Sequence, residues 1–138
     1  PCENIYVGGS SAGAYLAMML CFDEQYLGAH GLNPADVAGY LFDAGQPTTH
    51  FNVLNERGLD PRHIVVDEAA PLYHVGEPNG RPPVFITVAE NDMPGRFEQI
   101  QLLCQTLSQF GWPDERVLYR FLPGHMHVII FVTQFLQK

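Results

Sequence analysis

A chain of 138 residues can bury one hydrophobic core, but it is too short for two domains of ordinary size. Its composition, 46% hydrophobic and 16% charged, is that of a globular protein and excludes a disordered chain. A formal net charge of -8 argues against nucleic acid and against an anionic membrane surface as partners.

The cysteines and the apolar runs indicate the compartment. Cys2, Cys21 and Cys104 show neither CxxC nor metal-ligand spacing, and the last two lie in apolar, helix-like segments that favour reduced core residues. We therefore expect a cytoplasmic protein. No apolar run reaches the ~20 residues that cross a bilayer, and no signal-peptide pattern opens the chain. Since the first residue is Pro1 rather than Met, we expect a piece of a longer or processed protein.

Strands and helices alternate along the chain. Four short, continuously apolar runs predict buried strands, at residues 5–7, 37–45, 82–92 and 116–124. Helices are predicted at residues 12–22, 97–110 and 128–136, with two short ones at 51–57 and 68–74. This alternation is typical of right-handed βαβ units. It predicts an α/β fold with an open, mostly parallel sheet and helices on both faces, in three α/β/α layers.

We expect one domain over residues 1–138, because no repeat, low-complexity tract or linker divides the chain. The irregular stretch 46–80, rich in Pro, His and Gly, is a candidate cap or substrate-binding insert. Within it Phe51, Leu54 and Tyr73 are candidates either for a substrate pocket or for the core.

A serine motif connects the first predicted strand to the first helix. Gly9-Ser10-Ser11-Ala12-Gly13 matches GxSxG, in which a sharp strand-to-helix turn holds a nucleophile and small neighbours allow close approach. The amide N–H groups at the helix start then face the oxygen of an attacked carbonyl. A phosphate-binding turn is disfavoured, since neither GxGxxG nor GK[ST] is present. Ser11 is the central serine, whereas Ser10 would require glycine where Ala12 stands.

A serine nucleophile needs a base, and the base needs a carboxylate. Ligands of open sheets bind beyond the carboxyl ends of parallel strands, which is where such partners are expected. Two carboxylates, Glu90 and Asp92, follow the third strand, and two histidines, His125 and His127, follow the fourth. Asp43, after the second strand, is a candidate for the pocket or for a turn.

The other histidines give no sign of a metal site. They share no ligand spacing and are expected at the surface or in local hydrogen bonds: His30, His50, His63 and His74. We expect neither a metal nor an organic cofactor.

Four segments carry a resemblance to a known family: "GGSSAGAYLAMML", "EAAPLYHV", "PPVFITVAEND" and "FLPGHMH". Together they make nearly the whole chain resemble the C-terminal half of an α/β-hydrolase of the esterase/lipase kind, related to carbohydrate acetyl-esterases and to acylamide-hydrolysing enzymes. The nucleophile elbow is the most specific part. The family's G-E-x-D stretch favours Asp92 over Glu90, and its GxxH pattern, counted from Gly124, favours His127 over His125.

The resemblance implies roles and an activity. Ser11 would be the nucleophile, His127 the general base and then acid, and Asp92 the partner of the imidazolium, with the Ala12 N–H as one oxyanion donor. The implied reaction is hydrolysis of a small carboxylic ester, such as an acetyl ester, through an acyl-enzyme. Two alternatives stay open: an acylamide hydrolase of the same fold, and an inactive fragment that acts as an interaction module.

The sequence also departs from the family. About four strands and a loop, often HGGG-like, precede the elbow in the family and supply further oxyanion N–H groups. Here residues 5–7 already form the elbow strand, so one strand edge would lack a neighbour. We expect an N-terminal half, in the same or another chain, or a homodimer to cover that edge.

Overall fold

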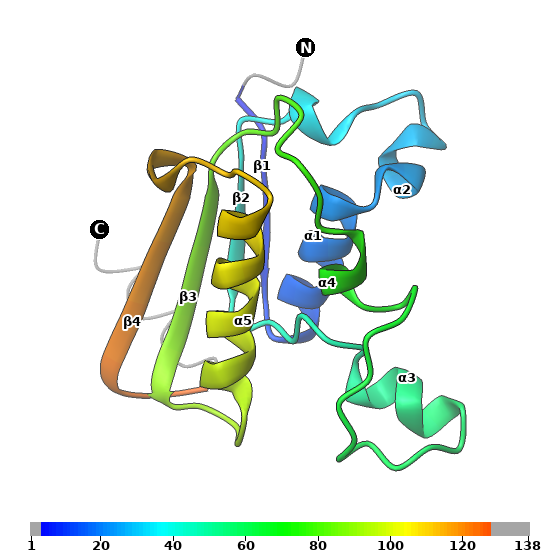
Figure 1. Cartoon of the computed structure of the whole chain (residues 1–138), viewed down its shortest axis with the longest axis vertical. Helices are drawn as coiled ribbons and strands as arrows, with labels where there is room; N and C mark the ends of the chain where they lie inside the picture. Colours follow the sequence, from blue (N-terminus) through cyan, green and yellow to red (C-terminus); the bar gives the residue numbers. More distant parts are fainter. Residues whose placement is uncertain (1–3, 128–138) are drawn as a thin grey trace.

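A four-stranded parallel sheet forms the centre of the protein in a computed structural model that describes residues 4–127 (Figure 1). Its order is β1 (Tyr6–Ser10), β2 (Gly39–Asp43), β3 (Val84–Asn91) and β4 (Val117–Met126), with every neighbouring pair parallel. The predicted α/β fold with an open parallel sheet is therefore confirmed.

The first strand differs from its prediction at residues 5–7, because Gly8 and Gly9 continue it instead of forming a turn. Gly8 pairs with Leu41 of β2, and a Cβ at Gly8 would lie 2.9 Å from the Leu41 Cβ. Glycine at this position allows the two strands to approach closely. The sequence around a glycine does not show whether it lies in a turn or in such a strand contact. The strand therefore reaches Ser10.

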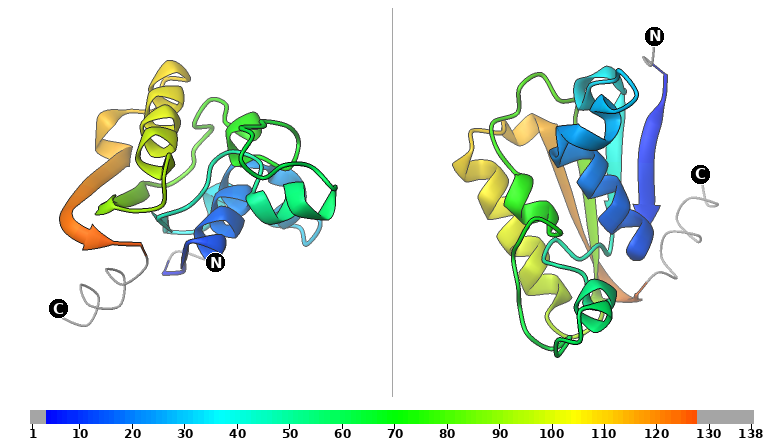
Figure 2. Two further views of the ribbon diagram at one scale, coloured as in Figure 1. Left: turned by 90° about the horizontal axis from the view of Figure 1, so that it is seen from below. Right: turned by 90° about the vertical axis from the view of Figure 1, so that its right-hand side faces the viewer.

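Among the described residues the helices lie on one side of the sheet (Figures 1 and 2), and the predicted helix layer on its other face stays a prediction. Their bounds are α1 (Ala12–Phe22), α2 (Glu24–Gly28), α3 (Phe51–Glu56), α4 (Pro71–His74) and α5 (Arg96–Gln109), with 3-10 turns at Pro34–Asp36 and Asp114–Arg116. α1 packs on β1 and β2, and α5 packs on β3. The helix predicted at 128–136 lies outside the described residues. Among residues 4–127, no helix is long and apolar enough to cross a membrane.

The core lies between this face and the helices. α1 contributes Met18 and Phe22, and the ring of Phe22 contacts those of Phe42 on β2 and of Trp112 after α5. Cys21 is free and fully buried, as the sequence predicts. Its burial raises the pKa of the thiol, so it remains a small apolar core residue.

The segment 46–80 begins inside the protein. Residues 44–50 are all buried, and the Gln46 side-chain amide donates to Thr48 Oγ1 at 3.0 Å. Of the three residues proposed for a pocket or the core, Leu54 is fully buried, Phe51 is half-buried and Tyr73 is 57% exposed. Leu54 is therefore a core residue.

β1 is an edge strand among the described residues, since β2 is its one described neighbour. Ile5 and Tyr6 at its start are 51% and 75% exposed. The expectation that an N-terminal half or a second copy covers this edge stays a prediction.

Candidate active site

Ser11 forms the corner between β1 and α1 and has an unusual backbone conformation. Its φ is 57° and its ψ is -116°, a region that L-residues seldom occupy and that persists only where neighbours hold it. The Ser11 N–H donates to the Asp43 carbonyl at 2.8 Å. A serine before a helix normally caps it with its hydroxyl, but Ser11 makes no such bond. Its Oγ is thus free for another partner.

Contact between β1 and the first turn of α1 makes this corner tight. A Cβ at Gly9 would lie 2.4 Å from the backbone carbon of Gly13, closer than real Cβ atoms come. A Cβ at Gly13 itself would meet nothing within 4 Å. Of the two motif glycines, Gly9 is therefore the one whose missing side chain the packing requires.

An irregularity in β4 brings His127 to this corner. Ala89 pairs with Leu122, and Asn91 pairs with Met126, so β4 uses two more residues than β3 over the same distance. Gly124, inside this bulge, has a φ of 72°. Figure 1 shows the end of β4 turning beneath β3 toward the start of α1. The bulge therefore lets an outer strand reach the end of β1.

Ser11, His127 and Asp92 lie in one line of contacts. Ser11 Oγ is 2.8 Å from His127 Nε2, across 116 residues of sequence. His127 Nδ1 is 2.6 Å from Asp92 Oδ1. Because a carboxylate only accepts, we assign the ring proton to Nδ1, which leaves Nε2 to accept from the Ser11 hydroxyl. The Asp92 side chain is 2% exposed and that of His127 is 23% exposed.

The Asp92 carboxylate is incompletely hydrogen-bonded. Its Oδ1 accepts from the Met93 N–H at 2.6 Å, and its contact with His127 Nδ1 lacks hydrogen-bond alignment. Within residues 4–127, Oδ2 is buried without a partner. A buried carboxylate in this state favours a nearby positive charge.

Arg96 supplies a positive charge near Asp92, and the sequence analysis missed it. The residue is 4% exposed, and its guanidinium donates to the Ala44 carbonyl and to Gln99 Oε1 at 3.3 Å. Burial lowers the pKa of Arg96, and the charge of Asp92 opposes that shift. One signal was available in the sequence. Arginine in the first turn of a helix interacts unfavourably with the helix dipole, so its presence there indicates another role.

The alternative site residues point elsewhere. Ser10 Oγ donates to Asp43 Oδ2 at 2.7 Å. Glu90 is exposed on β3. His125 places Nδ1 2.7 Å from the Pro123 carbonyl, to which the ring N–H donates. The structure thus brings together Ser11, Asp92 and His127, and none of these three alternatives joins them.

His50 lies at the start of α3 and is only 5% exposed. Its Nδ1 accepts from the Asn52 N–H at 3.1 Å, and its ring lies 5.0 Å from that of Tyr15 and 4.3 Å from that of Phe51. Burial first, and the charge of Arg96 second, lower the pKa of His50 below its ordinary 6.5. His50 is therefore neutral in the folded protein at pH 7.

This lowered pKa predicts a loss of stability in acid. The unfolded chain takes up a proton at His50 near pH 6.5, whereas the folded chain does so only at lower pH. The stability that neutral His50 contributes is thus fully present above pH 6.5, and it is lost as the pH falls through the pKa of His50 in the folded protein. We expect His50→Asn to reduce the decrease in Tm between pH 7.5 and 5.5, measured by thermal unfolding. Equal decreases in parent and variant contradict this.

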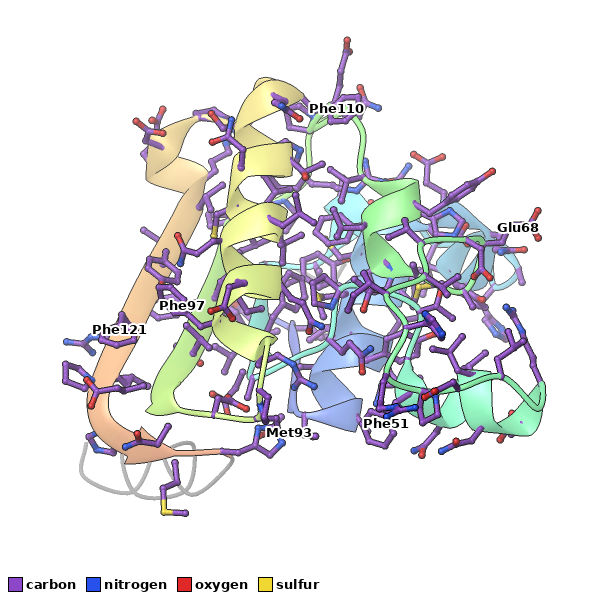
Figure 3. The ribbon with its side chains drawn as sticks, turned by 60° about the horizontal axis from the view of Figure 1, so that its bottom comes forward. Phe51, Glu68, Met93, Phe97, Phe110 and Phe121 are labelled. Atoms are coloured by element: carbon purple, nitrogen blue, oxygen red, sulfur yellow. The ribbon has the colours of Figure 1, made fainter. Side chains whose placement is uncertain are left out.

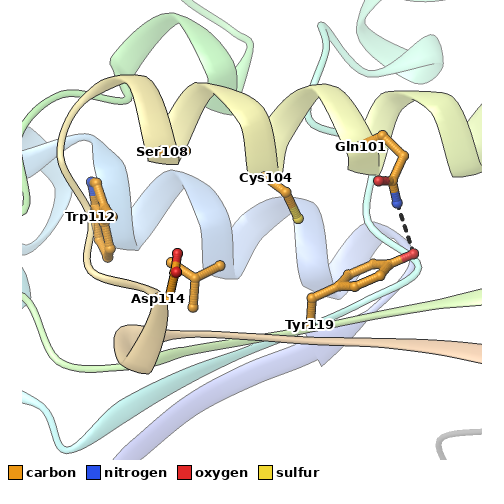
Figure 4. Close-up of a pocket in the computed structure, with 7 residues that line it drawn as sticks. Gln101, Cys104, Ser108, Trp112, Asp114 and Tyr119 are labelled. Atoms are coloured by element: carbon orange, nitrogen blue, oxygen red, sulfur yellow. Dashed lines mark hydrogen bonds between the residues drawn. The ribbon is translucent and has the colours of Figure 1, made fainter.

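A separate cavity of about 190 Å³ lies between α5 and β4 (Figure 4). Cys104, Trp112, Asp114 and Tyr119 are among its lining residues, and Gln101 donates to the Tyr119 hydroxyl at 2.8 Å across it. The cavity is not part of the arrangement around Ser11, which lies at the carboxyl ends of the strands. Figure 3 shows the labelled Phe51 and Met93 near that end of the sheet.

Comparison with known proteins supports the fold. Neither a protein-family model nor a curated protein sequence matches the chain. Similar solved structures are those of esterase 2 from the planctomycete Thermogutta terrifontis. The native form has a TM-score of 0.65 at 20% identity, covering 93% of this chain and 47% of that one. The propionate-bound form has a TM-score of 0.63 at 19% identity, covering 91% of this chain and 47% of that one.

A third structure, the same esterase phosphoramylated by tabun, has a TM-score of 0.64 at 20% identity and covers 93% and 46%. The chain thus spans about half the length of these structures. At this identity the likeness concerns the fold, an esterase-type α/β fold of which this chain matches a part.

Proposed function

We propose that this chain carries the catalytic centre of a serine hydrolase that cleaves small carboxylic esters. The observation that carries the proposal is the continuous contact from Ser11 Oγ through the His127 imidazole to the buried Asp92 carboxylate. A hydroxyl, a base and an orienting carboxylate in this order are the parts that acyl transfer requires. The strained backbone at Ser11 supports the same role, since strain at one residue is typical of functional sites.

The geometry suggests the steps. As Ser11 Oγ attacks the ester carbonyl, His127 Nε2 takes the hydroxyl proton, and the Asp92 carboxylate stabilises the imidazolium. The Ala12 N–H, at the first position of α1, has no acceptor within its own helix and can donate to the oxyanion. His127 then protonates the leaving alcohol. Water, activated by the same imidazole, releases the acid from Ser11.

The structural likeness to the Thermogutta esterase supports esters of short acyl groups as the substrates. That protein has been described with propionate and with butyrate bound. We carry this over as a proposal for acyl chains of two to about four carbons, a range that includes the acetyl ester implied by the sequence.

Covalent labelling tests the proposal directly. We expect a fluorophosphonate to add once to the parent chain, with loss of fluoride and the adduct on Ser11, and not to Ser11→Ala. Ser108→Ala, which removes a hydroxyl on α5, is the matched control and should label like the parent. Intact mass followed by peptide mapping gives the result. An adduct that persists in Ser11→Ala, or an unlabelled parent, contradicts the proposal.

The acid of the triad gives a further expectation. Asp92→Asn should lower kcat for p-nitrophenyl acetate by about 10^4-fold, because an amide at this position favours the wrong histidine tautomer. Glu90→Gln makes the same carboxylate-to-amide change at an exposed position near the end of β3, two residues before Asp92, and should stay within about twofold of the parent. Steady-state kinetics of the two variants compares them. Equal losses would show that Asp92 has no special role.

A further inference from the structure

Three polar residues form a row across the sheet directly beneath the nucleophile. Ser10, Asp43 and Thr87 are cross-strand neighbours in register on β1, β2 and β3. Ser10 Oγ donates to Asp43 Oδ2 at 2.7 Å, and Thr87 Oγ1 donates to Asp43 Oδ1 at 2.6 Å. One carboxylate thus joins the ends of β1 and β2 to the middle of β3. We call these residues the rim row.

The rim row is an energetically unfavourable way to stabilise the fold, because it buries a carboxylate. Asp43 is 2% exposed, and among residues 4–127 no cationic side chain forms an ion pair with it. Burial of a carboxylate is unfavourable unless hydrogen bonds compensate for it, and two hydroxyl groups are a small compensation. Apolar residues of similar size could join the same strands at lower cost. A buried charge held this close to Ser11 therefore points to a second role.

The backbone at the rim explains that role. Asp43 binds Ser10 with its side chain and, with its carbonyl, accepts the Ser11 N–H at 2.8 Å. Ala44, the residue that follows β2, also has a positive φ, of 55°, and its N–H donates to the Thr87 carbonyl at 3.0 Å. Two strained residues thus lie next to the rim row, one directly after β1 and one directly after β2. Strain of this kind persists only where neighbouring contacts hold the chain.

We propose that Asp43 is a positioning residue for the nucleophile. Its carboxylate fixes Ser10, and so keeps Ser11 in the strained conformation that holds Oγ 2.8 Å from His127 Nε2. Without this anchor Ser11 can relax to ordinary helix-capping geometry, in which its hydroxyl bonds to its own helix. The inference rests on the proposed function. It predicts that the chemical step slows while substrate binding stays unchanged.

The experiment removes the hydroxyl partners one at a time. Ser10→Ala and Thr87→Val each keep the carboxylate and one of its two hydrogen bonds, so they should fold even if Asp43→Ala does not. We expect each to lower the maximal rate of fluorophosphonate labelling at Ser11 about 10- to 100-fold, because small misplacements of reacting atoms have effects of this size. The half-saturating probe concentration should not change. Thr87→Ser restores the hydroxyl and should restore the rate.

Controls separate positioning from stability. Thr106→Val removes a hydroxyl from α5, whose bond is to the Leu102 carbonyl, and should label like the parent. If the rim row acts as one unit, the loss of labelling rate in the double variant Ser10→Ala/Thr87→Val should be smaller than the product of the two single losses. A labelled parent with undiminished rates in both single variants overturns the positioning role while the proposed function stands. An unlabelled parent overturns both.

Discussion

Replacement of His127 by alanine is expected to lower kcat for a small ester by about 10^6-fold, the loss typical of removing the base from a serine triad. The reason is geometric, since His127 Nε2 is the group 2.8 Å from Ser11 Oγ and no described side chain can take its place. KM should change little, because the imidazole acts mainly in the transition state. Steady-state hydrolysis of p-nitrophenyl acetate measures both quantities.

His125→Ala is the matched control for this prediction. The two histidines are separated by one residue, but His125 donates to the Pro123 carbonyl and not to the serine. We expect its kcat to stay within about threefold of the parent value. A loss in His125→Ala that equals or exceeds that in His127→Ala would show that the histidine was assigned wrongly.

Gly9→Ala is expected to produce the largest loss of stability among the glycine-to-alanine changes in residues 4–127. The new Cβ would lie 2.4 Å from the Gly13 backbone carbon and 2.5 Å from its carbonyl oxygen. A flexible side chain could move away, but both contacts are with the backbone of α1, which packs on β1 and β2. We expect the free energy of unfolding to fall by about 3 kcal/mol or more, out of a total of about 5–15 kcal/mol.

Gly13→Ala is the matched variant, since the same methyl group would there meet nothing within 4 Å. Alanine also loses less conformational entropy than glycine in a helix, so we expect an unchanged or slightly raised stability, by up to about 1 kcal/mol. Urea unfolding of both variants and the parent gives the comparison. A Gly9→Ala variant as stable as Gly13→Ala would mean that β1 and α1 separate readily, contrary to the packing described.

Local patterns predicted most elements because each pattern has a physical cause in the element itself. The apolar residues of α5 recur at helical spacing, and the predicted helix at 97–110 differs by one residue at each end from Arg96–Gln109. α2 was not predicted, since its five residues include none that is buried and so show no core-facing period. Its start depends instead on Asp23, whose side chain accepts from the Gln25 N–H at 3.1 Å.

At the site, the sequence indicated where to look but could not choose between neighbours on physical grounds alone. Parallel strands bring their carboxyl ends to one edge, so Ser11 and the acidic and histidine pairs were all expected there. Which members meet depends on the bulge in β4 and on the positive φ of Gly124. Distances across 116 residues are set by register, which no local pattern encodes.

By itself, the sequence indicated the order of most strands and helices, a serine at the corner between β1 and α1, and the end of the sheet at which its proposed partners lie. These follow from periodicity, turn residues and chain order, all of which are local. Only the tertiary structure decided that packing requires glycine at Gly9 rather than Gly13, that Asp43 joins three strands and that Arg96 lies buried within range of the Asp92 charge. Each of these depends on backbones and charges that come close only when β1, β2 and β3 pair in one register and α1 and α5 pack against them.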